Sequence, residues 1–142
     1  MVVQVVQENE SVWAGLCVAL WHDRSREFFI SERHNGEFSD EFLYMVGKEA
    51  VAFISLSVRR DYVEGTCSTP AGYLEGIYVK PEFRMQGIAS KLVEFAKQWS
   101  SDKGCLEFAS DCLIENEESR KFHNNIGFKE ANICVHFTMD LD

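Results

Sequence analysis

Long hydrophobic runs are absent from this sequence of 142 residues, and the longest contain only a handful of residues, as at 50–54. A membrane-spanning helix needs about 20 consecutive apolar residues, so no segment predicts one. Residues 1–4 carry no basic cluster, and we expect no secretory signal. Proline is scarce, with two residues, while hydrophobic residues make up 46% of the chain. This composition excludes a disordered chain and predicts a single folded domain over residues 1–142.

Paired cysteine motifs are also missing. The chain has five cysteines, an odd number, with no C-x-x-C pair, and Cys105 and Cys112 are too far apart for half of a zinc finger. The pattern favours reduced, mostly structural thiols in a cytoplasmic protein. We therefore expect no zinc or other metal site. The five cysteines are Cys17, Cys67, Cys105, Cys112 and Cys134.

Positive charge is in short supply, because 14 basic residues face 23 acidic ones and the net charge is −9. No basic patch is visible, so we expect no nucleic-acid partner. A negative cleft would concentrate a small polycation by electrostatic steering, which makes such a molecule a candidate substrate. The alternative is that the acidity serves only solubility.

The first half of the sequence predicts a strand, two helices and a hairpin. Trp13, Leu16, Cys17 and Leu20 recur at the spacing of one helical face. The hairpin is expected because two apolar runs flank Gly47 and Lys48. The expected ranges are a strand at 2–6, a helix from about 11 to 22, a less regular helix and a turn within 23–39, and strands at 38–46 and 49–58.

The second half predicts a strand, a helix and a strand in succession, which is a βαβ unit with parallel strands. The first strand, 73–80, is interrupted by Gly76, which suggests a bulge or a close backbone approach. Simple alternation along it puts Glu75 and Ile77 on one face and Gly76 on the other. Other expected elements are a helix from 88 to about 102, a strand at 106–110, a helix from 116 to 127, and two antiparallel closing strands after Phe128 and at 134–139.

The segment at 84–89 reads Arg-x-x-Gly-x-Ala and opens the 88–102 helix. A helix start has about four unpaired N–H groups and about half a positive charge, and Gly87 has no Cβ to keep a ligand away from the backbone. These features favour an anion site, such as one for a phosphate. A second ordered signal follows downstream, Asn116-x-x-Ser119-x-x-Phe122-His123, and it leads into Gly127-Phe128.

Together these segments resemble the acetyl-CoA-binding core of the GCN5-related N-acetyltransferase superfamily. More narrowly, nearly the whole chain resembles the aminoglycoside 6′-N-acetyltransferases, which are antibiotic-resistance enzymes. The narrower resemblance lies in residues 19–21, 60–65, 74–79, 103–105 and 109–111.

The resemblance implies acetyl-CoA as co-substrate, with no metal. Its pyrophosphate would lie on the backbone of the 84–90 segment and its pantetheine arm along the strand at 77–79. Asn116 matches an asparagine that contacts the pantetheine in the family. The implied cofactor-binding residues are Ile77, Tyr78, Val79, Arg84, Met85, Gln86, Gly87, Ile88, Ala89, Ser90, Asn116 and Ser119.

The resemblance also implies the acceptor chemistry. Glu75 and Asp111 would bind the ammonium groups of the substrate, and one of them would accept its proton. Where many relatives have a tyrosine that protonates the leaving thiolate, this chain has His123, and a histidine can serve as a general acid near neutral pH. The alternatives are a solvated Glu75, a helix-capping Asp111 and a packing or capping His123. Trp21 and Tyr62 match aromatic positions that line the aminoglycoside site, though an aromatic residue at a helix end is also typical of a core. Three further acidic residues would extend the negative field of the site or simply be solvated: Asp61, Glu64 and Glu115.

The expected fold is α/β (α+β), a mixed and mostly antiparallel sheet of six or seven strands with a parallel central pair and helices on both faces. A homodimer is expected because the family often dimerises. Three functions compete: direct acetyl transfer to the 6′-amine of an aminoglycoside, transfer to a polyamine or protein amine, and non-catalytic acyl-CoA binding. No cysteine has an evident activating partner, so we expect no covalent enzyme intermediate.

Overall fold

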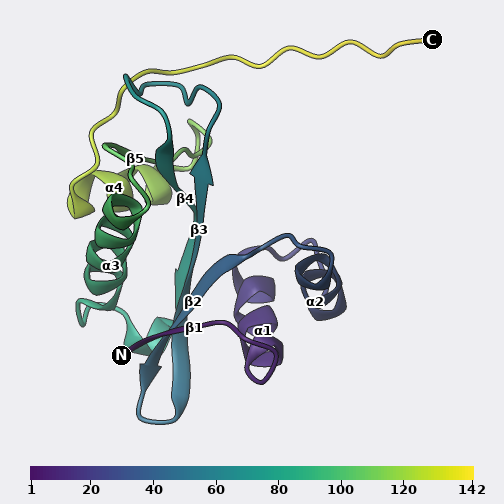
Figure 1. Cartoon of the computed structure of the whole chain (residues 1–142), viewed down its shortest axis with the longest axis vertical. Coiled ribbons are helices and arrows are strands. Elements are labelled where there is room, and N and C mark those ends of the chain that lie inside the picture. The colour runs from purple at the N-terminus through teal and green to yellow at the C-terminus, as the bar shows by residue number, and fades with distance from the viewer. The chain divides into compact units, whose positions relative to one another are not determined.

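The computed structural model describes residues 1–142, and the chain forms two compact parts, Met1–Ser110 and Asp111–Asp142. The first part contains a five-stranded sheet and three α-helices (Figure 1). Its elements are β1 (Val2–Gln4), α1 (Glu10–Leu20), α2 (Arg26–His34), β2 (Asp40–Val46), β3 (Glu49–Arg59), β4 (Ala71–Val79), the 3-10 turn η1 (Pro81–Phe83), α3 (Ile88–Asp102) and β5 (Phe108–Ala109). The second part contains α4 (Glu117–Ile126).

The sheet has the order β1-β2-β3-β4-β5, antiparallel throughout except for the parallel pair β4 and β5. The β2–β3 hairpin turns at Gly47, whose φ of +59° lies in the left-handed region that glycine adopts without a Cβ clash. The predicted hairpin, the mixed sheet and the parallel crossover through α3 are confirmed.

Helices cover both faces of the sheet, as predicted, with α1 and α2 on one side and α3 on the other (Figure 1). On the first face Trp13 and Cys17 are fully buried against Phe53 of β3. On the opposite face the Phe42 ring meets Phe95 of α3 with 4.7 Å between the ring centroids. The period-3.6 apolar stripes therefore become the two layers of the core.

A β-bulge in β4 determines which way Glu75 points. Ser55 pairs with Gly76 and Leu56 pairs with Leu74, so Glu75 is the extra residue of the bulge. The predicted irregularity at Gly76 is confirmed, but the simple alternation is wrong. Because the bulge breaks the period of two, Glu75 shares the α1 face with Gly76 instead of lying opposite to it.

The first turn of α4 is capped by the Asn116 side chain, whose Oδ1 accepts from the backbone N–H of Ser119 at 3.1 Å. Gly127 ends the helix with a φ of +111°. The two predicted closing strands are wrong, because residues 128–142 form no strand. Alternating apolar residues favour an extended chain but do not supply the neighbour whose backbone completes a ladder. The sheet therefore has five strands rather than six or seven, and the parallel pair lies at its edge.

No helix combines the length and the apolar character that a membrane span requires.

Candidate functional site

The loop before α3 presents a row of unpaired backbone donors. None of the N–H groups of residues 85–90 donates to a backbone carbonyl, and the first such bond of α3 is from Lys91 N to Gly87 O at 3.1 Å. Gly87 adopts a φ of +80°, and no atom lies within 4 Å of the position where its Cβ would be. Met85 is also left-handed, with a φ of +65°. The predicted anion cradle is therefore open and supplied with donors.

Arg84 is anchored beside this loop. Its Nε donates to the carbonyl of Val79 at 2.8 Å, and its guanidinium lies 5.4 Å from the centroid of the Tyr78 ring. The bond fixes a cation between the end of β4 and the loop, because β4 is held in the sheet. This position suits a role in binding phosphate.

The two parallel strands separate beside residues 77–79. β5 pairs with β4 only at Gly72 and Tyr73, and the Ser110 hydroxyl then donates to the carbonyl of Leu74 at 3.3 Å. Residues 77–79 pair with β3 on one side and have no β5 partner on the other. A strand edge exposed in this way can pair with an extended ligand.

The Glu75 carboxylate is paired with side chains of β3. Its Oε2 accepts a hydrogen bond from the Ser57 hydroxyl at 2.6 Å. The guanidinium of Arg59 donates to both of its oxygens, Nη2 to Oε1 at 2.9 Å and to Oε2 at 2.8 Å, and Nε to Oε2 at 3.1 Å. The carboxylate therefore has a fixed orientation on the α1 face of the sheet. Neither partner was predicted: Ser57 lies in the strand expected at 49–58, Arg59 was expected in the connection that follows it, and the pairing of β3 with β4 brings both to Glu75.

Trp21 lies directly over the bulge. A Cβ on Gly76 would be 2.5 Å from the Trp21 ring, so only glycine allows this contact. The ring also stacks on Phe29 and packs on Phe53, both at 5.7 Å between centroids. Trp21 is thus part of the core, and its ring lies against Gly76, the residue that follows Glu75 in β4. Tyr62 lies in the β3–β4 connection and is 67% exposed.

In the second part of the chain, Asn116, Ser119 and His123 form one connected group. Nδ1 of His123 lies 2.7 Å from the carbonyl of Ser119 and 3.3 Å from its hydroxyl. A carbonyl only accepts, so Nδ1 carries the proton and Nε2 of the neutral ring holds a lone pair. The predicted alternative of Asp111 as a helix cap is wrong, because α4 is capped by Asn116. Asp111 is exposed.

The model of the acetyltransferase (GNAT) family matches residues 6–128, which include the cradle, the bulge and α4. The chain belongs to this family. Membership makes it an acyltransferase that uses acetyl-CoA as donor.

Curated relatives and solved structures agree with this assignment. The aminoglycoside N(6′)-acetyltransferase type 1 of Acinetobacter genomosp. 13 is 36% identical over 129 residues, which cover 88% of each chain. The structure of the aminoglycoside antibiotic 6′-N-acetyltransferase AAC(6′)-IG from Acinetobacter haemolyticus has a TM-score of 0.93 at 32% identity and covers 100% of this chain and 99% of that one. AAC(6′)-Iy in complex with the bisubstrate analogue CoA-S-monomethyl-acetylneamine has a TM-score of 0.91 at 32% identity, with 99% and 98% covered. The predicted family resemblance is confirmed.

The geometry of the loop fits the phosphates of such a donor. A side chain at Gly87 would occupy the open space in front of the loop, and the N–H groups there have no other acceptor. No group of three or more His, Cys, Asp or Glu side chains is arranged to hold a metal ion.

Two titratable groups are buried beneath the α1 face. The Glu41 carboxyl, 1% exposed, accepts from Nε1 of Trp13 at 2.9 Å, and its other oxygen has no partner. Burial raises the pKa of Glu41 to about 8, against the opposing effect of hydrogen bonds from Ser55 and Trp13. Burial also raises the pKa of the Cys17 thiol, with the Glu41 charge adding to the effect. Cys17 therefore remains a thiol near neutral pH and is no nucleophile.

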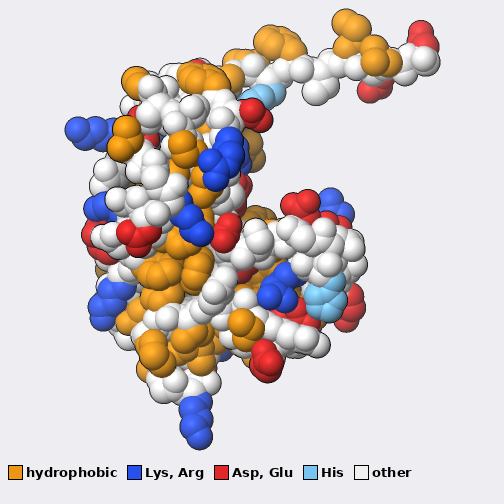
Figure 2. All heavy atoms as spheres, viewed as in Figure 1, with side chains coloured by type: hydrophobic (Ala, Val, Ile, Leu, Met, Phe, Trp, Pro, Cys, Tyr) orange, Lys and Arg blue, Asp and Glu red, His pale blue; other side chains and the backbone are white.

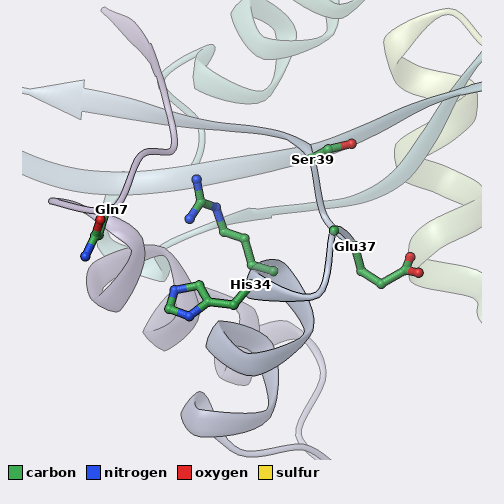
Figure 3. Close-up of a pocket in the computed structure, with 6 residues that line it drawn as sticks. Gln7, His34, Glu37 and Ser39 are labelled. Carbon is green, nitrogen blue, oxygen red and sulfur yellow. The ribbon is translucent and has the colours of Figure 1, made fainter.

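A separate cavity of about 590 Å³ lies beside the C-terminal end of α2 (Figure 3). Arg33 in its wall already donates to Oε2 of Glu10 at 2.7 Å, and Nε2 of His34 lies 2.9 Å from Oε1 of the same residue. Burial acts to raise the pKa of Glu10, but the hydrogen bonds from His34 and Arg33 outweigh it and lower the pKa. The cavity is lined by Gln7, Arg33, His34, Gly36, Glu37 and Ser39, and none of these is a predicted site residue.

Proposed function

We propose that the chain is an aminoglycoside 6′-N-acetyltransferase, which transfers the acetyl group of acetyl-CoA directly to the 6′-amine of an aminoglycoside. The observation that carries this proposal is the full-length similarity to AAC(6′)-Iy, whose structure holds an analogue joining CoA to an acetylneamine. The net charge of −9 supports it, because a polycationic acceptor would be attracted.

Acetyl-CoA supplies an acetyl group activated as a thioester. The backbone N–H groups of residues 85–90 would hold its pyrophosphate, and the anchored Arg84 would add a positive charge. The unpaired edge of β4 at 77–79 would bind the pantetheine arm through backbone hydrogen bonds. Asn116 and Ser119 would contact the same arm, Asn116 through the amide nitrogen that its capping bond leaves available.

Glu75 and Asp111 would bind the ammonium groups of the acceptor, and one of them would take the proton that the amine loses, directly or through water. Trp21, beside the bulge, and the exposed Tyr62 would flank the sugar rings. His123 would return a proton to the departing sulfur. Because its Nδ1 proton is held by the Ser119 carbonyl, it can donate from Nε2 only as the imidazolium.

The functional unit is a homodimer in this proposal. The apolar side chains of the C-terminal segment alternate with polar ones and are 66–90% exposed: Ile133, Val135, Phe137, Met139 and Leu141. They show in orange along the extended C-terminal segment (Figure 2). A row of this kind is typical of an interaction surface, and pairing with a second copy would give it a strand partner.

The matched family region runs across both compact parts, which supports a single catalytic domain over residues 1–142. We place it in the cytoplasm, where its five free cysteines would stay reduced.

Release of free thiol from acetyl-CoA, measured with kanamycin or tobramycin, spermidine and a peptide amine in parallel, tests the function. Turnover with the aminoglycosides supports the proposal. Turnover with spermidine or the peptide only would overturn it in favour of a polyamine or protein acetyltransferase. Acetyl-CoA binding without turnover on any amine would favour a non-catalytic binding module.

A further inference from the structure

The carboxylate proposed to bind the acceptor already holds a cation from its own chain. Three N–H···O contacts join the Arg59 guanidinium to Glu75, at 2.8 to 3.1 Å. The same guanidinium stacks on the Tyr73 ring, with its central carbon 3.5 Å from the ring centroid. An ammonium group is a donor of the same charge and would bind the same oxygens, so it and Arg59 compete for one site.

The two oxygens of Glu75 are held unequally. Oε2 accepts from the Ser57 hydroxyl as well as from Arg59, whereas Oε1 accepts only from Nη2 of Arg59. If Arg59 leaves, Ser57 still fixes Oε2, and Oε1 becomes the oxygen that can accept from a ligand. The carboxylate therefore keeps its orientation without Arg59.

Arg59 is placed so that it can leave. It is the last residue of β3 and precedes the long connection to β4. Its side chain is 43% exposed and that of Glu75 is 32% exposed. An ion pair exposed to this degree contributes about 1 kcal/mol or less in water, so a ligand with several ammonium groups can replace it.

We propose that Arg59 is an internal competitor for the acceptor, whose ammonium group must displace the guanidinium from Glu75 before transfer can occur. This inference rests on the proposed role of Glu75 and adds a determinant of specificity to it. An acceptor with one positive charge exchanges one ion pair for another and gains little. A polycation displaces Arg59 at Glu75 while its other ammonium groups bind elsewhere, so Arg59 selects for polycationic acceptors.

Isothermal titration calorimetry with kanamycin, spermidine and a monoamine tests the inference on the full chain. Arg59→Ala removes the competitor, and Arg59→Gln removes its charge while keeping a planar group over Tyr73. Arg60→Ala is the matched control, because it changes the net charge equally and Arg60 makes no hydrogen bond or ion pair. Glu75→Gln reports separately on whether Glu75 binds the acceptor.

We expect both Arg59 variants to lower the Kd of kanamycin by about two- to fivefold, the range that an exposed ion pair allows. The Kd of the monoamine should fall by a larger factor, because its single ammonium group has no other place to bind, and the selectivity for kanamycin over the monoamine should narrow. Arg60→Ala should change either Kd less than twofold.

Weaker or unchanged kanamycin binding in the Arg59 variants, with Glu75→Gln also weaker, would overturn the inference and make Arg59 a positioning residue. Unchanged binding in Glu75→Gln would overturn the inference together with the assignment of Glu75. If spermidine binds and responds to Arg59→Ala while kanamycin does not bind, the inference stands and the proposed acceptor is wrong. If neither polycation binds, both fail.

Discussion

Replacing Gly87 by aspartate tests the anion cradle at its centre. Gly87 precedes α3 with a φ of +80°, and the space where its Cβ would lie is open. Any side chain there costs about 1–2 kcal/mol in backbone strain. Aspartate also places a carboxylate where we expect a phosphate. Two like charges about 4 Å apart repel by about 4 kcal/mol at the effective dielectric constant of a protein surface.

The charge effect alone corresponds to a loss of about 10³-fold in acetyl-CoA affinity, since each 1.4 kcal/mol is a factor of ten. Gly87→Asn is the matched control, because asparagine has the same shape, tolerates the left-handed region and carries no charge. Calorimetric Kd values for CoA and acetyl-CoA measure the difference. Equal affinities in the aspartate and asparagine variants would refute the cradle.

Three further changes test other parts of the structure. Asp111→Asn should lower kcat/KM at least tenfold with little change in acetyl-CoA affinity, and full activity would remove Asp111 from the site. Glu41→Gln should remove a pH dependence of stability. Because the pKa of Glu41 is raised from 4.5 to about 8 in the folded protein, the folded state keeps a proton that the unfolded chain releases. The free energy of unfolding of the wild type should therefore fall by about 1 kcal/mol per pH unit between pH 5 and 8, and that of the variant should not. If the free energy of unfolding of the variant, measured by urea denaturation, falls with pH as steeply as that of the wild type, the result would contradict this. Gly76→Ala should lower the free energy of unfolding by about 1–3 kcal/mol, because the added Cβ meets the Trp21 ring. Adding Trp21→Leu should recover part of this loss. A urea midpoint of Gly76→Ala equal to that of the wild type would refute the contact.

The helices, the hairpin and the crossover could be predicted because their signals are local. The apolar spacing that includes Trp13 and Cys17 fixes the buried face of α1, and Gly47 permits the tight turn of the hairpin. The bulge could also be predicted locally, because an isolated glycine, Gly76, interrupts an apolar strand. The direction of Glu75 could not be read from alternation, because the bulge changes the register by one residue and moves the side chain to the other face.

The features that depend on distant partners escaped prediction. Residues 134–139 alternate like a strand, yet a strand exists only where another backbone pairs with it, and none does here. The Arg59–Glu75 ion pair joins residues 16 apart in sequence and requires the register of β3 and β4 to be known. The raised pKa of Glu41 depends on burial beneath α1, which composition does not reveal.

The most direct test of the proposed function uses two aminoglycosides that differ only at the 6′ position, one with an amine and one with a hydroxyl. Each is incubated with the enzyme and acetyl-CoA, and the products are examined by mass spectrometry and NMR. The account predicts that the amine compound gains one acetyl group on its 6′ nitrogen and that the hydroxyl compound is unchanged. Acetylation of both compounds at another amine, or of neither, would contradict it.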